Sequence, residues 1–269
     1  MKKTKSLAYP YIIWLIIFIV VPVLMILYYA FFDRGSFTLN NFNKILQGST
    51  TKTLITSFRV AFITTVVSLI LAYPFAYFMT KLKLRYRTAA MVLIMIPMWM
   101  NFLLRSYAWV AILAQNGILD NFLKIFGIRY SSFLYTEASV VLGMVYNFIP
   151  FMILPIYTAL EKIDKSLIEA SHDLGANNIQ TFWKVIFPLS LPGVFSGITM
   201  VFVPVISTFE VSTLLGGGMV NMIGNVIERQ FTSTGDWGYG SALSVVLMIL
   251  ILISILFDKE SVETGGINE

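Results

Sequence analysis

The chain has 269 residues, of which 57% are hydrophobic and only 12% are charged. A soluble domain carries about 25% charged residues, so this composition excludes an ordinary soluble protein and indicates an integral membrane protein. The net charge is +5, but most of the Lys and Arg residues lie beside apolar segments, where they set membrane topology. The positive charge therefore does not indicate nucleic-acid binding. With no Cys and a single His, we expect no disulfide framework, no metal cluster and no cofactor.

Six segments are long and apolar enough to cross a bilayer, which takes about 20 residues. Lipid offers the backbone no hydrogen-bond partners, so each segment is expected to be helical. The first follows a basic start but is too long for a signal peptide, and nothing divides the chain into separate folding units. We therefore predict one all-α, polytopic transmembrane domain over residues 1–269, with spans at 9–32, 54–80, 89–113, 137–160, 189–213 and 239–257.

Basic residues are unevenly divided between the two sides of these spans. One side holds Lys2, Lys3, Lys5, the KLKLRYR segment at 81–87, Lys162, Lys165, Lys184 and Lys259, whereas Arg34, Lys44, Lys52, Arg59, Lys124, Arg129 and Arg229 are scattered over longer loops on the other. The positive-inside rule makes the first side, with both termini, cytoplasmic. On the outer side, we expect Arg59 to reach lipid headgroups and Glu137 and Asp236 to cap spans four and six.

A polar segment at 161–188 separates the fourth and fifth spans. Asp164 or Ser166 is placed to cap a short helix, and Gly175 then provides the left-handed stop that helix ends favour. Asn177 or Asn178 is placed to cap a second short helix that ends before a proline. The segment is therefore predicted to be a bent pair of helices on the cytoplasmic face.

The first of these helices has one small and apolar face, formed by Leu167, Ser171 and Leu174 at helical spacing. Two interpretations fit such a helix pair. It either docks a partner protein or lies on the lipid headgroups, as Trp183 and Lys184 permit.

The spacing of Glu169, Ala170 and Gly175, followed by Val185 and Pro188, resembles the EAA loop of ABC-importer permeases. Three positions differ from the pattern but stay small or apolar: Ser171, Val185 and Phe187. In that family the loop is a coupling helix that enters a cleft on the ATPase subunit. The resemblance implies this role for the candidate coupling residues Glu169, Ala170, Ser171, Asp173, Leu174 and Gly175.

The physical properties of these residues suit a coupling role. Ala170 and Ser171 permit close approach of a partner surface, and Glu169 can accept a charge-assisted hydrogen bond at the rim. Gly175 sets the angle between the two helices. His172 is expected to be an exposed polar residue that reaches the ATPase at the rim of the contact.

The resemblance extends over nearly the whole chain, through YPFAYFM, IPMWMNFLLRSYAW, IPFMILPIYTALEKIDKSLIEASHDLGA and LLGGGMVNMIGNVIERQF. These segments are similar to the PotB-like permeases of spermidine/putrescine importers, and imply the six-helix permease fold in a bacterial plasma membrane. The family implies a second, PotC-like permease, two copies of a PotA-like ATPase and an extracytoplasmic PotD-like binding protein. Sulfate, molybdate, iron and phosphonate importers share the architecture, so their substrates remain alternatives.

Two charged residues stand out within the predicted spans, Arg105 in the third and Glu210 in the fifth, and such residues usually face the bundle interior or a water-filled cavity. In span five, Ser196, Thr199, Val203, Ser207, Glu210 and Thr213 form one seam at helical spacing. A polycation needs carboxylates and aromatic faces. The candidate pathway residues are Glu210, Ser207, Thr213, Trp99, Tyr107, Trp109, Tyr146, Asn147 and Phe209. Alternatively, Glu210 neutralises Arg105, and the aromatic side chains anchor span ends.

Three function classes are compared. A transporter subunit without catalysis of its own, working by alternating access while partner ATPases hydrolyse ATP, is favoured. A membrane enzyme would need clustered catalytic groups, and neither H-E-x-x-H, G-x-S-x-G nor a cysteine nucleophile occurs. A self-sufficient channel or secondary transporter would show inverted repeats and flux without ATP.

Overall fold

The computed structural model describes residues 9–33, 35–46, 49–128 and 132–264, with side chains in these ranges except those of Tyr9, Leu46 and residues 256–264. The topological charges Lys2, Lys3, Lys5, Arg34 and Arg129, and the side chain of Lys259, lie outside the described part. Within it, the only strands are the short antiparallel pair β1 (Phe32–Asp33) and β2 (Ser36–Phe37). The predicted all-α class is confirmed.

The helices follow one another along the chain, with three π-helical turns labelled η. They are α2 (Tyr9–Leu15), η1 (Ile16–Val20), α3 (Val21–Phe31), α4 (Asn40–Leu46), α5 (Ser49–Lys81), α6 (Leu84–Trp99), α7 (Phe102–Leu113), α8 (Ile118–Ile125), α9 (Glu137–Glu161), α10 (Lys165–Asp173), α11 (Asn178–Thr181), η2 (Phe182–Ile186), α12 (Phe187–Ser207), α13 (Glu210–Gly216), α14 (Ile223–Arg229), η3 (Gln230–Thr234) and α15 (Trp237–Thr264).

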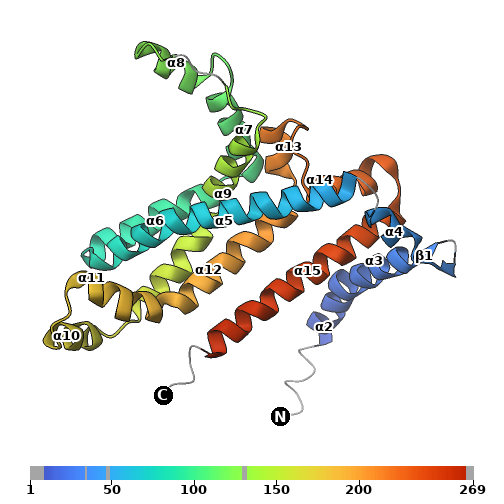
Figure 1. Ribbon diagram of the computed structural model, residues 1–269. Helices are drawn as coiled ribbons and strands as arrows, with labels where there is room; N and C mark the ends of the chain where they lie inside the picture. Colours follow the sequence, from blue (N-terminus) through green and yellow to red (C-terminus); the bar gives the residue numbers. More distant parts are fainter. Residues whose placement is uncertain (1–8, 34, 47–48, 129–131, 265–269) are drawn as a thin grey trace.

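Helices α5, α9 and α12 pack against one another at the centre of the bundle, α15 packs on α12, and α3 packs on α15 (Figure 1). The 161–188 loop, the α5–α6 turn, the start of α2 and the end of α15 lie on the lower side of this view. Helices α4, α13 and α14 lie at the opposite end, and α7 with α8 projects away from the bundle. We call the end with the 161–188 loop the loop end.

Close packing of α9 on α12 depends on two glycines spaced four residues apart, Gly193 and Gly197. A Cβ added at Gly193 would lie 2.5 Å from both Ala159 Cβ and the Pro155 carbonyl oxygen, and one added at Gly197 would lie 2.7 Å from Met152 Sδ. In membranes, small residues at this spacing let helix backbones approach closely and gain van der Waals contact. The G-x-x-x-G sequence therefore fixes the central helix crossing.

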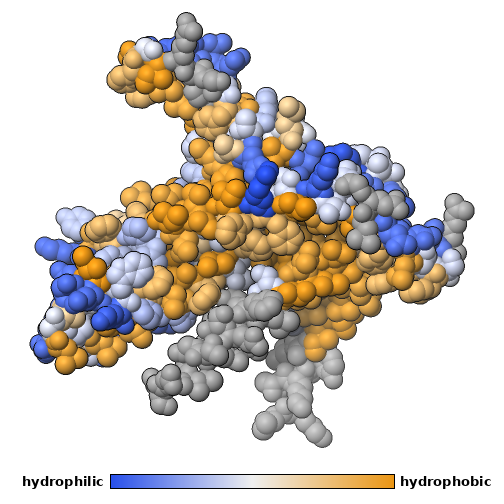
Figure 2. Space-filling view, viewed as in Figure 1, coloured by the Kyte–Doolittle hydropathy of each residue, from blue (hydrophilic) through white to orange (hydrophobic). Residues whose placement is uncertain are grey.

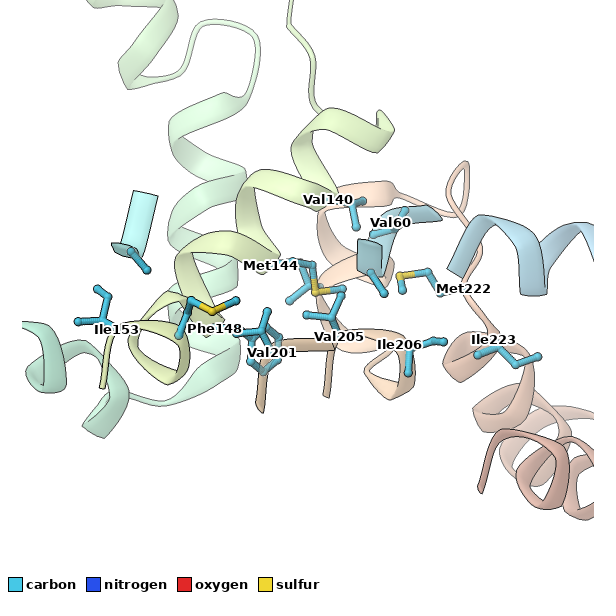
Figure 3. Close-up of a cluster of buried hydrophobic side chains, with 14 of the residues drawn as sticks. Val60, Val140, Met144, Phe148, Ile153, Val201, Val205, Ile206, Met222 and Ile223 are labelled. Atoms are coloured by element: carbon cyan, nitrogen blue, oxygen red, sulfur yellow. The ribbon is translucent and has the colours of Figure 1, made fainter. Parts of the chain in front are cut away.

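The core between these helices is a cluster of buried hydrophobic side chains (Figure 3), and small hydroxyl residues of α5 are buried as well. Val60 of α5, Met144 of α9 and Val205 of α12 are fully buried and belong to one cluster. Ser57 is also fully buried; its hydroxyl donates to the Thr53 carbonyl at 2.9 Å and accepts from a backbone N–H of α14 at 2.7 Å. This bonding to the helix backbone leaves no unpaired donor at Ser57.

The expected third and fifth spans are each interrupted. The third breaks after Trp99, where Asn101 caps α7 by accepting from two backbone N–H groups at 2.9 and 3.2 Å. The fifth ends at Ser207 rather than continuing to residue 213. Each break comes two or three residues after a proline, Pro97 or Pro204, which cannot donate to the helical ladder and weakens it locally.

By length and composition, six described segments qualify as membrane spans: Pro10–Phe31, Ser49–Lys81, Phe102–Ile125, Glu137–Glu161, Asn178–Ser207 and Trp237–Ile255. The third is shifted along the chain from the expected 89–113, because the break at Asn101 leaves α6 short. Apolar surface covers the middle of the bundle, and polar surface gathers at the loop end and at the opposite end (Figure 2). This pattern is that of a multi-pass membrane protein.

Candidate functional site

The first half of the 161–188 loop is α10, and local hydrogen bonds fix both of its ends. The Asp164 carboxylate accepts from the Ser166 backbone N–H at 3.0 Å, which caps the helix and lowers the pKa of Asp164. Gly175 has a φ of +83°, and the Ala176 N–H donates to the Ser171 carbonyl at 3.0 Å. The structure thus uses Asp164 of the two predicted caps, and the predicted stop at Gly175 is confirmed.

The second half of the loop begins with a reciprocal cap. The Asn177 side chain accepts from the Gln180 N–H at 2.9 Å, and the Gln180 side chain accepts from the Asn177 N–H at 3.0 Å. The expected separate helix ending before Pro188 is not formed, because α11 continues through η2 into α12. The proline is accommodated directly after the π-helical turn, where the hydrogen-bond ladder is already displaced.

A buried hydrogen bond joins the two halves of the loop. Ser171 Oγ and Thr181 Oγ1 are 2.8 Å apart, and Ser171 Oγ donates to the Ile168 carbonyl at 2.8 Å, so Thr181 is the donor of the pair. Ser171 was expected to face a partner; instead it packs against its own chain and is 9% exposed. It holds the bend between α10 and α11.

The neighbours of Ser171 present an exposed surface formed by Ala170, Asp173, Leu174 and Gly175. Leu174 is 89% exposed and Ile179 of α11 is 71% exposed, so apolar side chains stand at the tip of the loop. Glu169 is exposed too, but it lines a cavity between α10 and the bundle. Exposed apolar side chains on a firmly capped bend are typical of a protein-docking surface.

The predicted polar seam of span five does not continue as one helical stripe. After Ser207 the backbone leaves the helix, and Glu210 begins the separate short helix α13. The half-buried Glu210 carboxylate accepts from Thr208 Oγ1 at 2.9 Å across the break. Thr213 is exposed and donates to the Phe209 carbonyl at 2.8 Å.

A groove of about 560 Å³ lies beside this break, between α12, α14, η3 and α15. It contains the predicted residues Ser207 and Phe209 together with Glu228 and Phe231, which were not predicted. Within the described part of the chain Glu228 forms no ion pair, and its carboxylate accepts only from Thr232 Oγ1, at 3.0 Å. We call this the α12–α15 groove. It places a carboxylate beside two aromatic rings, which is the chemistry that binds alkylammonium ions.

Asn225 holds the helices around this groove together. Its amide donates to the Phe209 carbonyl at 3.1 Å and to Thr213 Oγ1 at 2.7 Å, and its oxygen accepts from Ser212 Oγ at 2.6 Å. Asn225 is 8% exposed. These bonds attach α13 to α14 and position Phe209 at the groove.

Two predicted aromatic residues lie together in a different groove, of about 710 Å³, between α5, α7 and α9. The Trp109 and Tyr146 rings meet edge to face with centroids 5.3 Å apart. Glu137 lies at this groove and pairs with Arg59, which was expected to reach headgroups. Thr136, rather than Glu137, caps α9.

The remaining predicted pathway residues lie apart from both grooves. Trp99 is 86% exposed and Tyr107 is 57% exposed, whereas Asn147 is buried and donates to the Gly143 carbonyl at 2.8 Å. The nine candidates therefore do not form one site within this chain. The α12–α15 groove combines Ser207 and Phe209 with a carboxylate in one cavity.

Arg105 is buried, with 7% exposure, and among the described residues neither its Nε nor its Nη1 has a hydrogen-bond partner. Its guanidinium lies 5.5 Å from the Phe102 ring centroid. Within the described residues it forms no ion pair with Glu210, so the alternative structural pair is not present in this conformation. Over the same residues there is no group of three or more His, Cys, Asp or Glu side chains placed to hold a metal ion.

Comparison with known proteins decides the family. Residues 68–259 match the family model described as binding-protein-dependent transport system inner membrane component. The chain belongs to this family. As a family member it is an inner-membrane transport permease, the type of subunit that works with a separate ATPase.

Relatives with curated names cover nearly the whole chain. The spermidine/putrescine transport system permease protein PotB of Escherichia coli (strain K12) is 38% identical over 252 residues, which are 90% of this chain and 92% of that one. PotB of Haemophilus influenzae is 38% identical over 251 residues, 90% of this chain and 88% of that one. A PotB homolog of Mycoplasma genitalium is 28% identical over 95% of this chain and 91% of its own.

Solved structures support the fold. A bacterial ABC transporter involved in the import of the acidic polysaccharide alginate aligns with a TM-score of 0.84, over 99% of this chain and 96% of that one, at 16% identity. The MetNI methionine ABC transporter in an inward-facing conformation aligns with a TM-score of 0.57 over 80% of this chain and 95% of that one, at 17% identity. At these identities the likeness establishes the permease architecture alone.

Proposed function

We propose that this permease carries polyamines such as spermidine and putrescine in an ATP-driven importer. The supporting observation is the 38% identity to PotB proteins over nine-tenths of the chain. The chemistry of the α12–α15 groove agrees with it, because Glu228 attracts an ammonium group while Phe209 and Phe231 cover methylene carbons and cationic ends. A carboxylate with no ion pair would repel sulfate, molybdate or a phosphonate.

The complex would contain a second, PotC-like permease, two copies of a PotA-like ATPase and an extracytoplasmic PotD-like binding protein. The loop end would face the cytoplasm, together with both termini, because the basic KLKLRYR segment lies there. The surface of Ala170, Asp173, Leu174 and Gly175 would then contact the ATPase. ATP hydrolysis would occur on that subunit, and this chain would supply no catalytic group.

Substrate would pass by alternating access, with the second permease covering the α12–α15 groove. The break between Ser207 and Glu210 lies in the wall of this passage. Glu210 is a second carboxylate near the break, bonded to Thr208, and would exchange that bond for an ammonium group. Two carboxylates on separate short helices suit a flexible cation that carries charge at both ends.

The test is uptake of labelled spermidine, putrescine and sulfate by the complex reconstituted in proteoliposomes, with and without ATP. We expect ATP-dependent polyamine uptake that Glu228→Gln lowers at least tenfold. Glu210→Gln should lower it less, because the Glu210 carboxylate already accepts a hydrogen bond from Thr208 and is less available to an ammonium group. Arg229→Gln is the matched control, because it changes the adjacent charge and does not line the groove. ATP-driven sulfate uptake, or polyamine uptake without ATP, would refute the proposal.

A further inference from the structure

A cavity of about 640 Å³ separates the 161–188 loop from the loop end of the bundle. Its floor comes from the end of α5 and the start of α6, including Tyr77, Lys81 and Arg87. Its roof comes from α10, including Lys165 and His172. This loop cavity is distinct from the exposed docking surface, which lies around Leu174 at the tip of the loop, and from the α12–α15 groove.

The cavity is lined by more cations than carboxylates. Lys81 and Lys165 take part in no ion pair within the described residues, and Lys81 Nζ lies 4.5 Å from the Tyr77 ring centroid. The cavity also contains Glu161, which is already neutralised by Arg87 at 2.6 Å. Two ammonium groups are therefore available to an anion, and only one lining carboxylate, Glu169, lacks a basic partner.

Arg87 adds a buried donor, its Nε, that has no acceptor among the described residues. Its Nη1 donates to Glu161 and its Nη2 donates to the Thr80 carbonyl at 2.7 Å, but its Nε has no acceptor. A buried N–H without a partner is unfavourable, so an anion that reaches Arg87 from the cavity would be stabilised. Phosphate oxygens suit this position, because they accept from arginine and lysine together.

We propose that the loop cavity binds the phosphate headgroup of an anionic phospholipid. The cavity lies where spans α5 and α9 end, which is headgroup depth whichever side of the membrane the loop end faces. Phe78, Leu82 and Leu84 flank Lys81 and are 67%, 41% and 74% exposed, so they provide an apolar surface for acyl chains beside the cationic cavity. Basic pockets between membrane helices on the cytoplasmic side recognise anionic headgroups in this way.

A headgroup in this position bridges the coupling loop and the bundle. Its oxygens would contact Lys165 on α10 and Lys81 on α5, which line opposite sides of the cavity. The bound lipid therefore stiffens the joint through which the loop acts on the spans. This consequence rests on the proposed function, whereas lipid binding itself does not.

Lipid binding is tested on the intact complex by native mass spectrometry after delipidation and titration with phosphatidylglycerol or phosphatidylcholine. We expect phosphatidylglycerol to be retained at least tenfold better than phosphatidylcholine, and the preference to disappear in the double variant Lys81→Gln, Lys165→Gln. The matched control is Lys83→Gln, Lys162→Gln, which removes the same charge at the same end but does not line the cavity. Equal loss in both double variants, or no preference in the unmodified protein, overturns the proposal.

Two further experiments distinguish a lipid headgroup from free phosphate, and failure of the lipid site from failure of the proposed function. Inorganic phosphate at 10 mM should not displace the lipid; displacement would assign the site to a free anion and overturn the lipid assignment. In nanodiscs, phosphatidylglycerol should raise the ATPase activity stimulated by the loaded binding protein in the control variant and not in the Lys81, Lys165 variant. If polyamine transport is absent in every lipid while retention persists, the proposed function fails and the lipid site stands.

Discussion

Substituting Gly175 tests whether the bend of the 161–188 loop transmits force. Its φ of +83° is a conformation that L side chains rarely adopt, yet a Cβ added there would meet nothing within 4 Å. Gly175→Ala therefore changes backbone energy without a steric clash, at a cost of about 1–2 kcal/mol. That cost lowers the population of the bent loop relative to other conformations by a factor of about 5–30.

The chain offers a matched control at Gly127, which follows α8. Its φ is +71°, and a Cβ added there also meets nothing within 4 Å. Gly127→Ala therefore has the same backbone cost at a site away from the 161–188 loop. Gly175→Asn is a graded variant, because Asn tolerates the left-handed region better than Ala.

The measurement is transport per ATP hydrolysed by the complex in proteoliposomes, with thermal unfolding recorded in parallel. We expect Gly175→Ala to lower transport per ATP at least fivefold, Gly175→Asn to lower it less, and Gly127→Ala to leave it unchanged. Wild-type coupling in Gly175→Ala, or an equal loss in Gly127→Ala, would refute the argument that the bend is the coupling element.

Three further predictions concern stability, measured as thermal unfolding in detergent. Gly193→Val should destabilise by about 1–3 kcal/mol through overpacking against α9, whereas Met200→Val on the exposed face of α12 should change little. Partial burial raises the pKa of Asp236, but hydrogen bonds from Lys44 and a backbone N–H outweigh burial and lower it. The Lys44–Asp236 ion pair therefore stabilises the folded protein by under about 1 kcal/mol, since both side chains are exposed. This contribution is present above about pH 4, the unfolded pKa of Asp, and should be lost as the pH falls through the lower folded pKa. Asp236→Asn should abolish this pH dependence. Arg105→Met should stabilise by about 1–4 kcal/mol, and destabilisation would mean that the guanidinium has a partner in the folded chain.

Local chemistry made the loop ends predictable from sequence. A cap such as Asp164 and a stop such as Gly175 depend on residues within one helical turn, so a single sequence contains what determines them. The direction of Ser171 was not predictable in the same way. Helical spacing placed it on one face with Leu167 and Leu174, but only the three-dimensional position of Thr181 determines that this face turns inward at Ser171.

The pathway residues show a different limit. Their grouping assumed that span five was one helix through Glu210, and a helical stripe has no meaning across the break after Ser207. Glu228 was missed because it lies between predicted spans, in a segment treated as a loop. The segment LLGGGMVNMIGNVIERQF carried the family resemblance but did not show that Glu228 and Phe209 line one groove, which depends on how α14 packs beside α12 and α15.

The two helix breaks, after Trp99 and after Ser207, share a structural arrangement. Both follow a proline, and the short helices that begin after them, α7 and α13, pack against each other and against α9. Asn225 attaches α13 to α14 by side-chain hydrogen bonds, whereas the side-chain bond recorded across the α12–α13 break joins Thr208 to Glu210. We expect bending at the break rather than within α12, because the helical hydrogen-bond ladder ends at Ser207 whereas Gly193 and Gly197 hold α12 closely against α9. The α12 part of span five thus continues from the 161–188 loop, and beyond the break lie Phe209 and Glu210, which we propose meet the substrate.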